Sequence, residues 1–378
     1  MCEKGIKRYF GRMKIPTIRY SRDTTDFTKT LRARVDAYFA ERNLSRKGDW
    51  RLYLKTGVMV SLYFVPWALI TWGFAGSGWM FWVAEFIMGL GLAGIGLNVM
   101  HDANHDAYSD KKWINTWMGR ILDLVGGNAA IWKIQHNVLH HTFTNVDGLD
   151  EDIDMHPFMR FSPLKPRYWW HRFQHIYSWG FYSLMTLFWM VVKDWLQLRR
   201  YHRKDLIRPA GTSVAELSTS LAITKTVYFT YVMLLPMLLS GVHWFQIILG
   251  WVLMQVVAGF ILAIIFQPAH VMEDHDYHPA EKGAVLDVDP LTHQLLTTSN
   301  FGTGSRLLTW LCGGLNHQIE HHLFPQMSHI HLAKIAPIVK KTAEEFGIPY
   351  RSSTTYWQAI GRHTRMLYAL GRSPHIAS

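Results

Sequence analysis

Residues 80–105 read MFWVAEFIMGLGLAGIGLNVMHDANH, and this stretch decides the fold class of the chain. Residues 80–99 are almost wholly apolar, and a helix of about 20 apolar residues crosses a hydrocarbon core of about 30 Å. His101 and His105 follow directly, four positions apart. Residues at that spacing share one face of a helix. The stretch therefore predicts a membrane-spanning helix that ends in a pair of histidines.

Three further apolar runs predict that the chain crosses the membrane several times. Residues 56–75 precede the quoted run across a short uncharged turn, and residues 222–242 and 244–266 form a second pair. The chain has 17 Trp and 16 Tyr, and many of them lie near the ends of these runs, as in interfacial aromatic belts. The fold class predicted for this 378-residue chain is an all-α membrane protein with four transmembrane helices.

The net charge of +11 could indicate a nucleic-acid-binding protein, but its distribution favours a membrane protein. No Lys or Arg occurs between Lys55 and Lys111, and only Lys225 lies between Arg208 and Lys282. Basic residues that flank the spans on one side follow the positive-inside rule and face anionic headgroups in the cytoplasm. No nucleic-acid recognition motif accompanies the charge. We therefore predict a multi-pass integral membrane protein, in the inner membrane if bacterial, that contacts the lipid bilayer and no nucleic acid.

Two more histidine clusters lie on polar stretches of the chain. They comprise His136, His140 and His141, and His317, His321 and His322. Imidazole is the commonest side-chain metal ligand, and adjacent histidines on an α-helix diverge by about 100°, so such a pair could serve two ions. Seven or more histidines are too many for one tetrahedral zinc. The clusters therefore predict two metal ions at a membrane surface.

The stretch 177–196 is hydrophobic enough to suggest a fifth span, but Lys193 and Asp194 interrupt its end. A crossing there would put the third histidine cluster on the opposite side of the membrane from the first two. Because clusters that share a metal site must face one side, we predict that 177–196 lies in or partly in the interface. The predicted parts are a cytoplasmic, amphipathic lead (1–55), transmembrane hairpins (56–99 and 222–266) and a cytoplasmic helical cap (100–221 and 267–378).

The residue types favour iron as the metal. The chain has no Glu-x-x-His motif of the kind used by soluble di-iron bundles and only two cysteines. An imidazole-rich set suits Fe, Zn, Cu or Ni, and of these iron and copper activate oxygen readily. His270, which follows the fourth span as His101 follows the second, is a further predicted ligand.

Other polar residues are predicted to support the ligands or to lie at the surface. Acidic side chains that could orient the imidazoles, or could form a solvated acidic face, are Asp102, Asp106, Asp147, Asp150, Asp152, Asp154 and Glu320. The histidines predicted to lie at the surface or behind the ligands are His156, His171, His175, His275, His278, His293, His329 and His331.

Longer motifs resemble the membrane fatty acid desaturases with three histidine boxes, over about residues 15–371. Residues 127–152, which contain HNVLHH at 136–141, look like the central block of that family. Residues 313–325, GGLNHQIEHHLFP, look like the third box of front-end desaturases, in which Gln replaces the first histidine. Residues 336–349 are similar to the tail of the same group.

The resemblance implies a four-span fold whose cytoplasmic cap holds two non-haem Fe ions. The implied ligands are His101, His105, His136, His140, His141, His270, Gln318, His321 and His322. Behind them would lie Gln267, Asp102, Asn137 and Glu320. Most relatives have an aromatic residue where this chain has His317, whose spacing to His321 and His322 copies the second cluster. Either His317 or Gln318 could ligate, and the family pattern favours Gln318.

The resemblance also implies the reaction: O2-dependent desaturation that leaves a cis double bond in a fatty acyl chain, towards its carboxyl end (Δ5/Δ6-like, as in a linoleoyl-CoA desaturase). The acyl carrier stays open between CoA, acyl carrier protein and a glycerolipid. The alternatives are a di-iron lipid hydroxylase and a zinc-bearing membrane protein without redox turnover.

The His-Pro-Gly-Gly of a fused cytochrome b5 domain is absent from this sequence, which predicts a separate electron donor, such as ferredoxin or cytochrome b5 with a reductase. Basic residues of 199–208, with Lys334, Lys340 and Lys341, form a candidate docking surface for an acidic donor. Contact of the same residues with lipid headgroups is the alternative.

Overall fold

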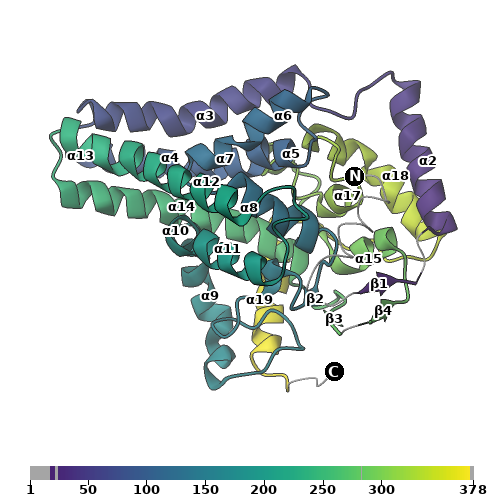
Figure 1. Ribbon diagram of the computed structural model, residues 1–378. Helices are drawn as coiled ribbons and strands as arrows, with labels where there is room; N and C mark the ends of the chain where they lie inside the picture. The colour runs from purple at the N-terminus through teal and green to yellow at the C-terminus, as the bar shows by residue number, and fades with distance from the viewer. Residues whose placement is uncertain (1–17, 22–23, 282, 375–378) are drawn as a thin grey trace. The chain divides into compact units, whose positions relative to one another are not determined.

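The computed structural model describes residues 18–21, 24–281 and 283–374, so the first residues of the predicted lead lie outside the described part. The described chain is mostly helical (Figure 1). It divides into two compact units. Unit 1 draws on Met1–Gly48, Ile134–Ser178 and Ile265–Ser378, and unit 2 on Asp49–Lys133 and Trp179–Ile264.

Four helices in the described ranges are long and apolar enough to cross a membrane, which confirms the predicted number and order. They are α3 (Trp50–Thr71), α4 with η1 and α5 (Trp79–Asn104), α12 with η6 and α13 (Val214–Leu239), and α14 (Trp244–His270). α3 begins before the predicted residue 56 because the Asp49 side chain accepts a hydrogen bond from the backbone nitrogen of Arg51 and caps the helix. The apolar pattern alone missed this first polar turn.

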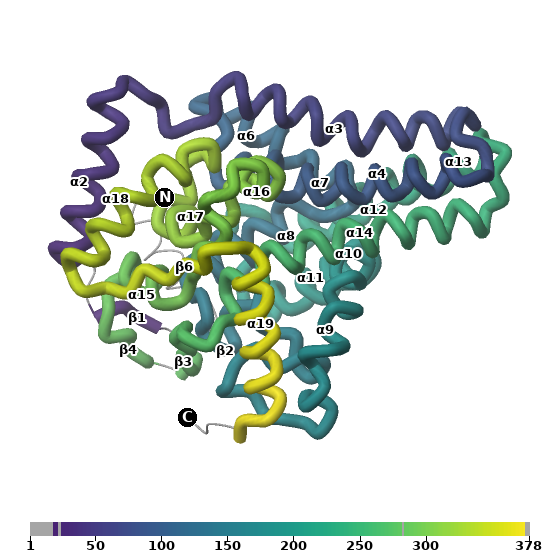
Figure 2. The backbone as a smooth tube through the Cα atoms, turned by 180° about the vertical axis from the view of Figure 1, so that it is seen from behind, coloured from purple at the N-terminus to yellow at the C-terminus, as the bar shows by residue number. Residues whose placement is uncertain are grey.

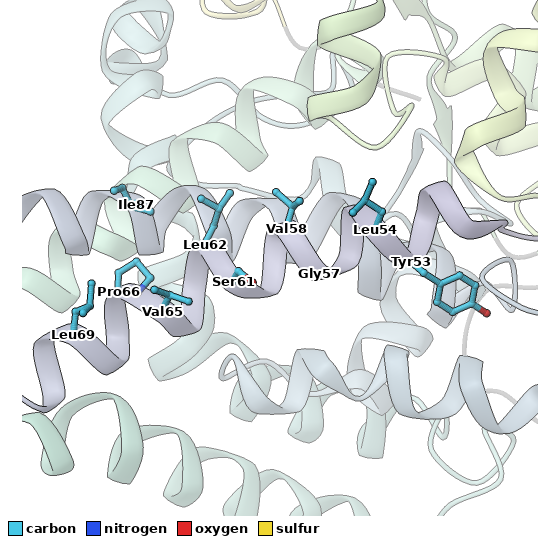
Figure 3. A pocket seen from close by; sticks show the side chains of 10 residues that line it. All are labelled: Tyr53, Leu54, Gly57, Val58, Ser61, Leu62, Val65, Pro66, Leu69 and Ile87. Atoms are coloured by element: carbon cyan, nitrogen blue, oxygen red, sulfur yellow. The ribbon is translucent and has the colours of Figure 1, made fainter.

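α3 and α4 pack closely in unit 2 because a glycine lies where they meet. A Cβ added at Gly91 of α4 would lie 2.5 Å from the backbone nitrogen of Tyr63 in α3. Side chains of α3, with Ile87 of α4, line an open groove of about 800 Å³ (Figure 3). Leu54, Val58 and Val65 are among the apolar side chains that line it. This surface is apolar, as expected of a helix surface that meets lipid.

The stretch 177–196 does not form one long span. It falls on α9 (Gln174–Ser183), α10 (Met185–Phe188), the π-helix η5 (Trp189–Lys193) and α11 (Asp194–Arg203), with a break at Leu184. The Thr186 hydroxyl donates to the carbonyl oxygen of Gln255 in α14 (2.6 Å). A Cβ at Gly259 would lie 2.7 Å from the Ser183 carbonyl oxygen. The stretch therefore packs against the middle of α14.

A buried ion pair joins α11 to the third candidate span. The Lys225 ammonium donates to Asp194 Oδ2 (2.7 Å) and to the carbonyl oxygen of Gly126 (2.6 Å). Trp189 Nε1 donates to the other carboxylate oxygen of Asp194 (2.8 Å). Both charged side chains are buried. Lys225 is the only basic residue of this candidate span, and Asp194 compensates its charge.

Unit 1 has its own apolar core, built from α2 (Asp26–Glu41), α15 (Pro290–Thr297), α17 (Gln318–Leu323) and α18 (Leu332–Glu345). The amphipathic lead predicted over 1–55 contains the helix α2. Its apolar residues Phe27, Leu31, Val35 and Phe39 are buried in this core. A helix with one apolar stripe buries that stripe against whichever apolar partner is available. Here that partner is protein.

Short elements complete the fold. In unit 2 they are α6 (Lys112–Gly119), α7 (Ile121–Leu124) and α8 (Ala129–Lys133). In unit 1 they are η2 (Ile134–His140), η3 (Glu151–Ile153), η4 (Trp169–Phe173), α16 (Arg306–Leu311), η7 (His329–His331) and α19 (Tyr356–Leu370). The two-residue strands of unit 1 pair in parallel: β1 (Arg19–Tyr20) with β4 (Val285–Leu286), β2 (Val146–Asp147) with β3 (His278–Pro279), and β5 (Asn300–Phe301) with β6 (Ser352–Ser353). Figure 2 shows α2 and α18 side by side.

Asp289 ties α15 to α2, and we expect its loss to destabilise unit 1. Its carboxylate caps α15 by accepting from the backbone nitrogen of Leu291 (3.0 Å), and it accepts from the Thr28 hydroxyl (2.7 Å). Burial raises the pKa of Asp289, but hydrogen bonds from Thr292 and Thr28 outweigh it and hold the pKa below its ordinary value. Asp289→Ala should cost about 1–2 kcal/mol in the free energy of unfolding at neutral pH.

Because the folded-state pKa is depressed, this stabilisation is present above the unfolded-state pKa of about 3.9 and is lost as the pH falls through the folded-state value. Denaturant unfolding at pH 7 and near pH 3 measures it. The exposed Asp287, with one hydrogen bond from Ser21, gives the matched control Asp287→Ala. An equal loss in both variants, or a loss for Asp289→Ala that does not shrink in acid, would contradict the assignment.

Candidate metal centre

Unit 1 brings together the predicted ligands of the second and third clusters with His270. The Nε2 atoms of His136 and His141 lie 3.2 Å apart, and those of His141 and His321 lie 3.0 Å apart. One ring nitrogen from each of His140, His270 and His322 lies within 4.8 Å of the others. Unit 1 thus contains two adjoining trios of histidines.

The backbone of η2 explains how the second cluster reaches both trios. η2 is a π-helix, and the backbone nitrogen of His141 donates to the carbonyl oxygen of His136 (3.0 Å), five residues earlier. This i→i+5 turn, which is frequent at functional sites, brings the rings of His136 and His141 to a centroid distance of 4.7 Å. An α-helix would have placed only His136 and His140 on one face. The sequence reasoning assumed an α-helix and missed the 136–141 contact.

Asp150 and Asp152 orient the second cluster. His140 Nδ1 lies 3.0 Å from Asp150 Oδ1, while His136 Nδ1 lies 3.7 Å from Asp152 Oδ2. Burial lowers the pKa of His140, but the two carboxylates outweigh it and raise the pKa to about 9. A hydrogen bond at Nδ1 leaves Nε2 as the atom that can bind a metal.

Three other acidic residues of unit 1 have partners that are not histidines. Asp147 and Asp154 both pair with Lys165, at 2.9 and 3.3 Å. Glu320 accepts from Asn300 Nδ2 and from the Tyr350 hydroxyl, each at 2.8 Å. These three carboxylates therefore hold unit 1 together through lysine, asparagine and tyrosine.

Gln318 and His317 occupy different surroundings. Gln318 Nε2 lies 3.0 Å from His270 Nε2, so its amide lies among the histidines. His317 is buried, and its Nδ1 lies 3.8 Å from Glu320 Oε2. Gln267 Nε2 lies 3.5 Å from the carbonyl oxygen of Asp152.

The first cluster belongs to unit 2. His101 and His105 are buried at the end of the second candidate span, with ring centroids 4.9 Å apart. The Trp132 ring packs against both, at a centroid distance of 5.7 Å from each. Asp102 lies buried between them in the sequence. The predicted i, i+4 pair is therefore present within this unit.

Several histidines predicted at or near the surface are buried. They are His171, His275, His293, His329 and His331. His275 lies directly behind a predicted ligand, since its Nδ1 lies 2.7 Å from the carbonyl oxygen of His270 and its Nε2 lies 2.6 Å from the Ser299 hydroxyl. His293 Nε2 lies 2.9 Å from the carbonyl oxygen of Thr144. The surface alternative is wrong for these residues, because each is buried in the structure.

The sequence reasoning also missed Gln294. Its Oε1 lies 2.7 Å from His322 Nδ1, and its Nε2 donates to the carbonyl oxygen of His141 (3.0 Å). Nothing in the surrounding letters marks it, since Gln294 precedes His322 by 28 residues. Only the folded contact between α15 and α17 reveals its place.

The donor set fits a metal ion. His270 Nδ1, His322 Nε2 and Gln318 Oε1 are buried and have no hydrogen-bond partner among the described residues. Burial, reinforced by neighbouring histidines, lowers the pKa of His322 well below its ordinary value, so its ring is neutral and able to ligate. A set of imidazoles without a thiolate suits Fe, Zn, Cu or Ni. A bound ion would satisfy nitrogens that are otherwise costly to bury.

Comparisons with known proteins agree with this geometry. The fatty acid desaturase family model matches residues 77–354. The chain is 35% identical to the sn-1 linoleoyl-lipid 6-desaturase of Synechocystis sp., over 92% of this chain and 96% of that protein. It is 31% identical to the protein of that name from Arthrospira platensis, over 92% and 93%. It is 32% identical to the acyl-lipid (8-3)-desaturase of Physcomitrium patens, over 95% and 75%. The chain therefore belongs to the fatty acid desaturase family of oxidoreductases.

Proposed function

We propose that this protein is a front-end acyl-lipid desaturase that introduces a cis double bond near the carboxyl end of a fatty acyl chain, of the linoleoyl-lipid 6-desaturase type. The observation that carries the proposal is the buried set of imidazoles in unit 1, where His270 Nδ1 and His322 Nε2 have no hydrogen-bond partner among the described residues, in a chain with four candidate spans. The names of the relatives support the lipid-linked substrate and the position of the bond. The names of these relatives do not favour the hydroxylase or the zinc-protein alternative.

We further propose that the site holds two non-haem iron ions. Its ligands in unit 1 would be His136, His140, His141, His270, His321 and His322 with Gln318; the resemblance to the desaturases also implies His101 and His105, which belong to unit 2. Iron bound there would activate O2. With two electrons and two protons from the donor and the solvent, O2 would remove one hydrogen from each of two adjacent methylenes and end as two waters. The donor of those electrons would be a separate ferredoxin or cytochrome b5. The site would face the cytoplasm.

The residues of the chain contribute orientation. Asp150 holds His140 by its Nδ1, and Gln318 in place of a histidine offers a neutral amide oxygen. Reactivity differs little along a methylene chain, so the position of the double bond must come from how the acyl chain is held relative to the site. We also propose that an acidic electron donor docks on the basic residues of 199–208 and on Lys334, Lys340 and Lys341. Residues 199–208 belong to unit 2, and Lys334, Lys340 and Lys341 belong to unit 1.

The experiment is the fatty acid profile of a host that expresses this chain and is fed linoleate, measured by gas chromatography–mass spectrometry with location of the double bonds. We expect a new bond at carbon 6, in lipid-bound chains, with two irons per purified polypeptide. An empty vector and a His140→Ala variant are the controls. A hydroxylated product would favour the alternative enzyme, and one zinc per chain without a product would end the desaturase proposal.

A further inference from the structure

Gln294 lies between the second and third histidine clusters, in the short helix α15. α15 packs against α17, which carries His321 and His322, through Leu291 and Leu295 in the apolar core of unit 1. This packing fixes the backbone beneath the Gln294 side chain. The side chain is itself buried, with 5% of its surface exposed, so its amide must find all of its partners within the protein.

The partners of the amide determine which way it faces. One end of the amide lies 3.0 Å from the carbonyl oxygen of His141, and the other lies 2.7 Å from His322 Nδ1. A backbone carbonyl can only accept a hydrogen bond. The NH2 group must therefore face His141, because the reverse orientation would bring two oxygens together. Oε1 then faces His322 and the Thr144 hydroxyl, which lies 2.9 Å away.

This orientation fixes the tautomer of His322. Oε1 can only accept, so His322 Nδ1 must carry the proton and donate it. A neutral imidazole has one protonated nitrogen, which leaves the lone pair on Nε2. His322 Nε2 is buried and has no hydrogen-bond partner in the described chain, so its lone pair is available to a metal ion. The backbone carbonyl of His141 in the second cluster thus determines, through Gln294, which nitrogen the third cluster presents.

We propose that Gln294 is a positioning residue of the metal centre, which holds His322 in the tautomer and orientation that bind the ion and couples it to the second cluster. The inference rests on the proposed metal centre. Gln294 accepts a hydrogen bond from Nδ1 of His322, as Asp150 does from Nδ1 of His140. The acceptor is a neutral amide at His322 and a carboxylate at His140. Loss of such a partner typically costs about 10–100-fold in metal affinity.

The test is retention of iron by the purified full-length protein in detergent. Holoprotein is challenged with a ferrous chelator, and the iron that remains is measured together with the Mössbauer spectrum of ⁵⁷Fe-labelled protein. We expect Gln294→Leu, which has no acceptor for His322 Nδ1, to lose iron at about 10–100-fold lower chelator concentration and to show an altered spectrum. Gln294→Glu keeps an acceptor for His322 Nδ1 but places a second oxygen against the His141 carbonyl, so we expect it to retain more iron than Gln294→Leu and less than the parent.

Gln174→Leu is the matched control. Gln174 is an equally buried glutamine of unit 1 whose amide bonds to the backbone of Arg160 and Leu367, away from the histidines. It should lose stability, measured by thermal unfolding, and keep its iron and spectrum. If Gln294→Leu does not fold, Gln294→Asn decides, since it keeps the amide but is one methylene too short to reach His322.

The proposal is overturned if Gln294→Leu, or failing that Gln294→Asn, keeps the parent's iron retention and spectrum. It is also overturned if Gln174→Leu loses iron equally, or if Gln294→Glu loses as much as Gln294→Leu. These readouts do not depend on the product formed. A parent protein that holds iron but makes no unsaturated lipid would therefore refute the proposed function and leave the role of Gln294 standing.

Discussion

Replacing His140 by alanine should abolish product formation, by more than about 100-fold. The change removes the imidazole that lies with His270 and His322 in one trio. It also leaves the fully buried Asp150 carboxylate without its 3.0 Å imidazole partner. The lipid profile of the expressing host and the iron content of the purified variant measure both effects. Thermal unfolding in detergent checks that the variant is folded.

His331→Ala is the matched control for that loss. His331 is as buried as His140, with 3% of its surface exposed, but its Nε2 lies 3.1 Å from the carbonyl oxygen of Lys47 and its ring packs on Phe39. We expect this variant to lose about 1–3 kcal/mol of stability and to keep both iron and product. Retained desaturation by His140→Ala would refute its role as a ligand. A folded but inactive His331→Ala would show that the site extends further than the two trios.

Replacing Lys225 by methionine should destabilise unit 2 by about 3–5 kcal/mol, since it leaves a buried charge unpaired. Asp194, whose side chain is 1% exposed, would keep the hydrogen bond from Trp189 Nε1 but lose its only salt-bridge partner among the described residues. The carbonyl of Gly126 would also lose its 2.6 Å donor. Unfolding of the purified protein in detergent, followed by denaturant or heat, measures the loss.

A double variant separates the charge from the shape of the side chains. Lys225→Met with Asp194→Leu removes both charges, and it should recover most of the stability, because burying neither ion avoids the cost of desolvation. The difference between the double variant and the sum of the single variants gives the coupling energy. Lys112→Met, at an exposed position of α6 in the same unit, should change stability by less than about 0.5 kcal/mol. If Lys225→Met also lost less than about 0.5 kcal/mol of stability, the ion pair would contribute little to the free energy of unfolding.

The apolar runs of the sequence predicted the membrane helices well, and they failed where polar residues begin a helix or where an apolar face has two possible partners. α3 begins at Trp50 because of the Asp49 cap. α2 buries Phe27 and Val35 against protein. Hydropathy measures how strongly a side chain prefers an apolar environment to water. It does not record whether lipid or protein covers it, so the sequence indicated an amphipathic lead but not the partner of α2 in the core of unit 1.

By itself, the sequence determined the fold class, the number of candidate spans and the residue types that can hold metal. These follow from local composition and spacing, which need no knowledge of distant contacts. Only the tertiary structure decided that η2 is a π-helix that brings His136 to His141, and that Gln294 lies between His141 and His322. The physical reason is that such contacts join residues far apart in sequence or depend on a backbone form that side-chain spacing does not specify, so packing alone selects them.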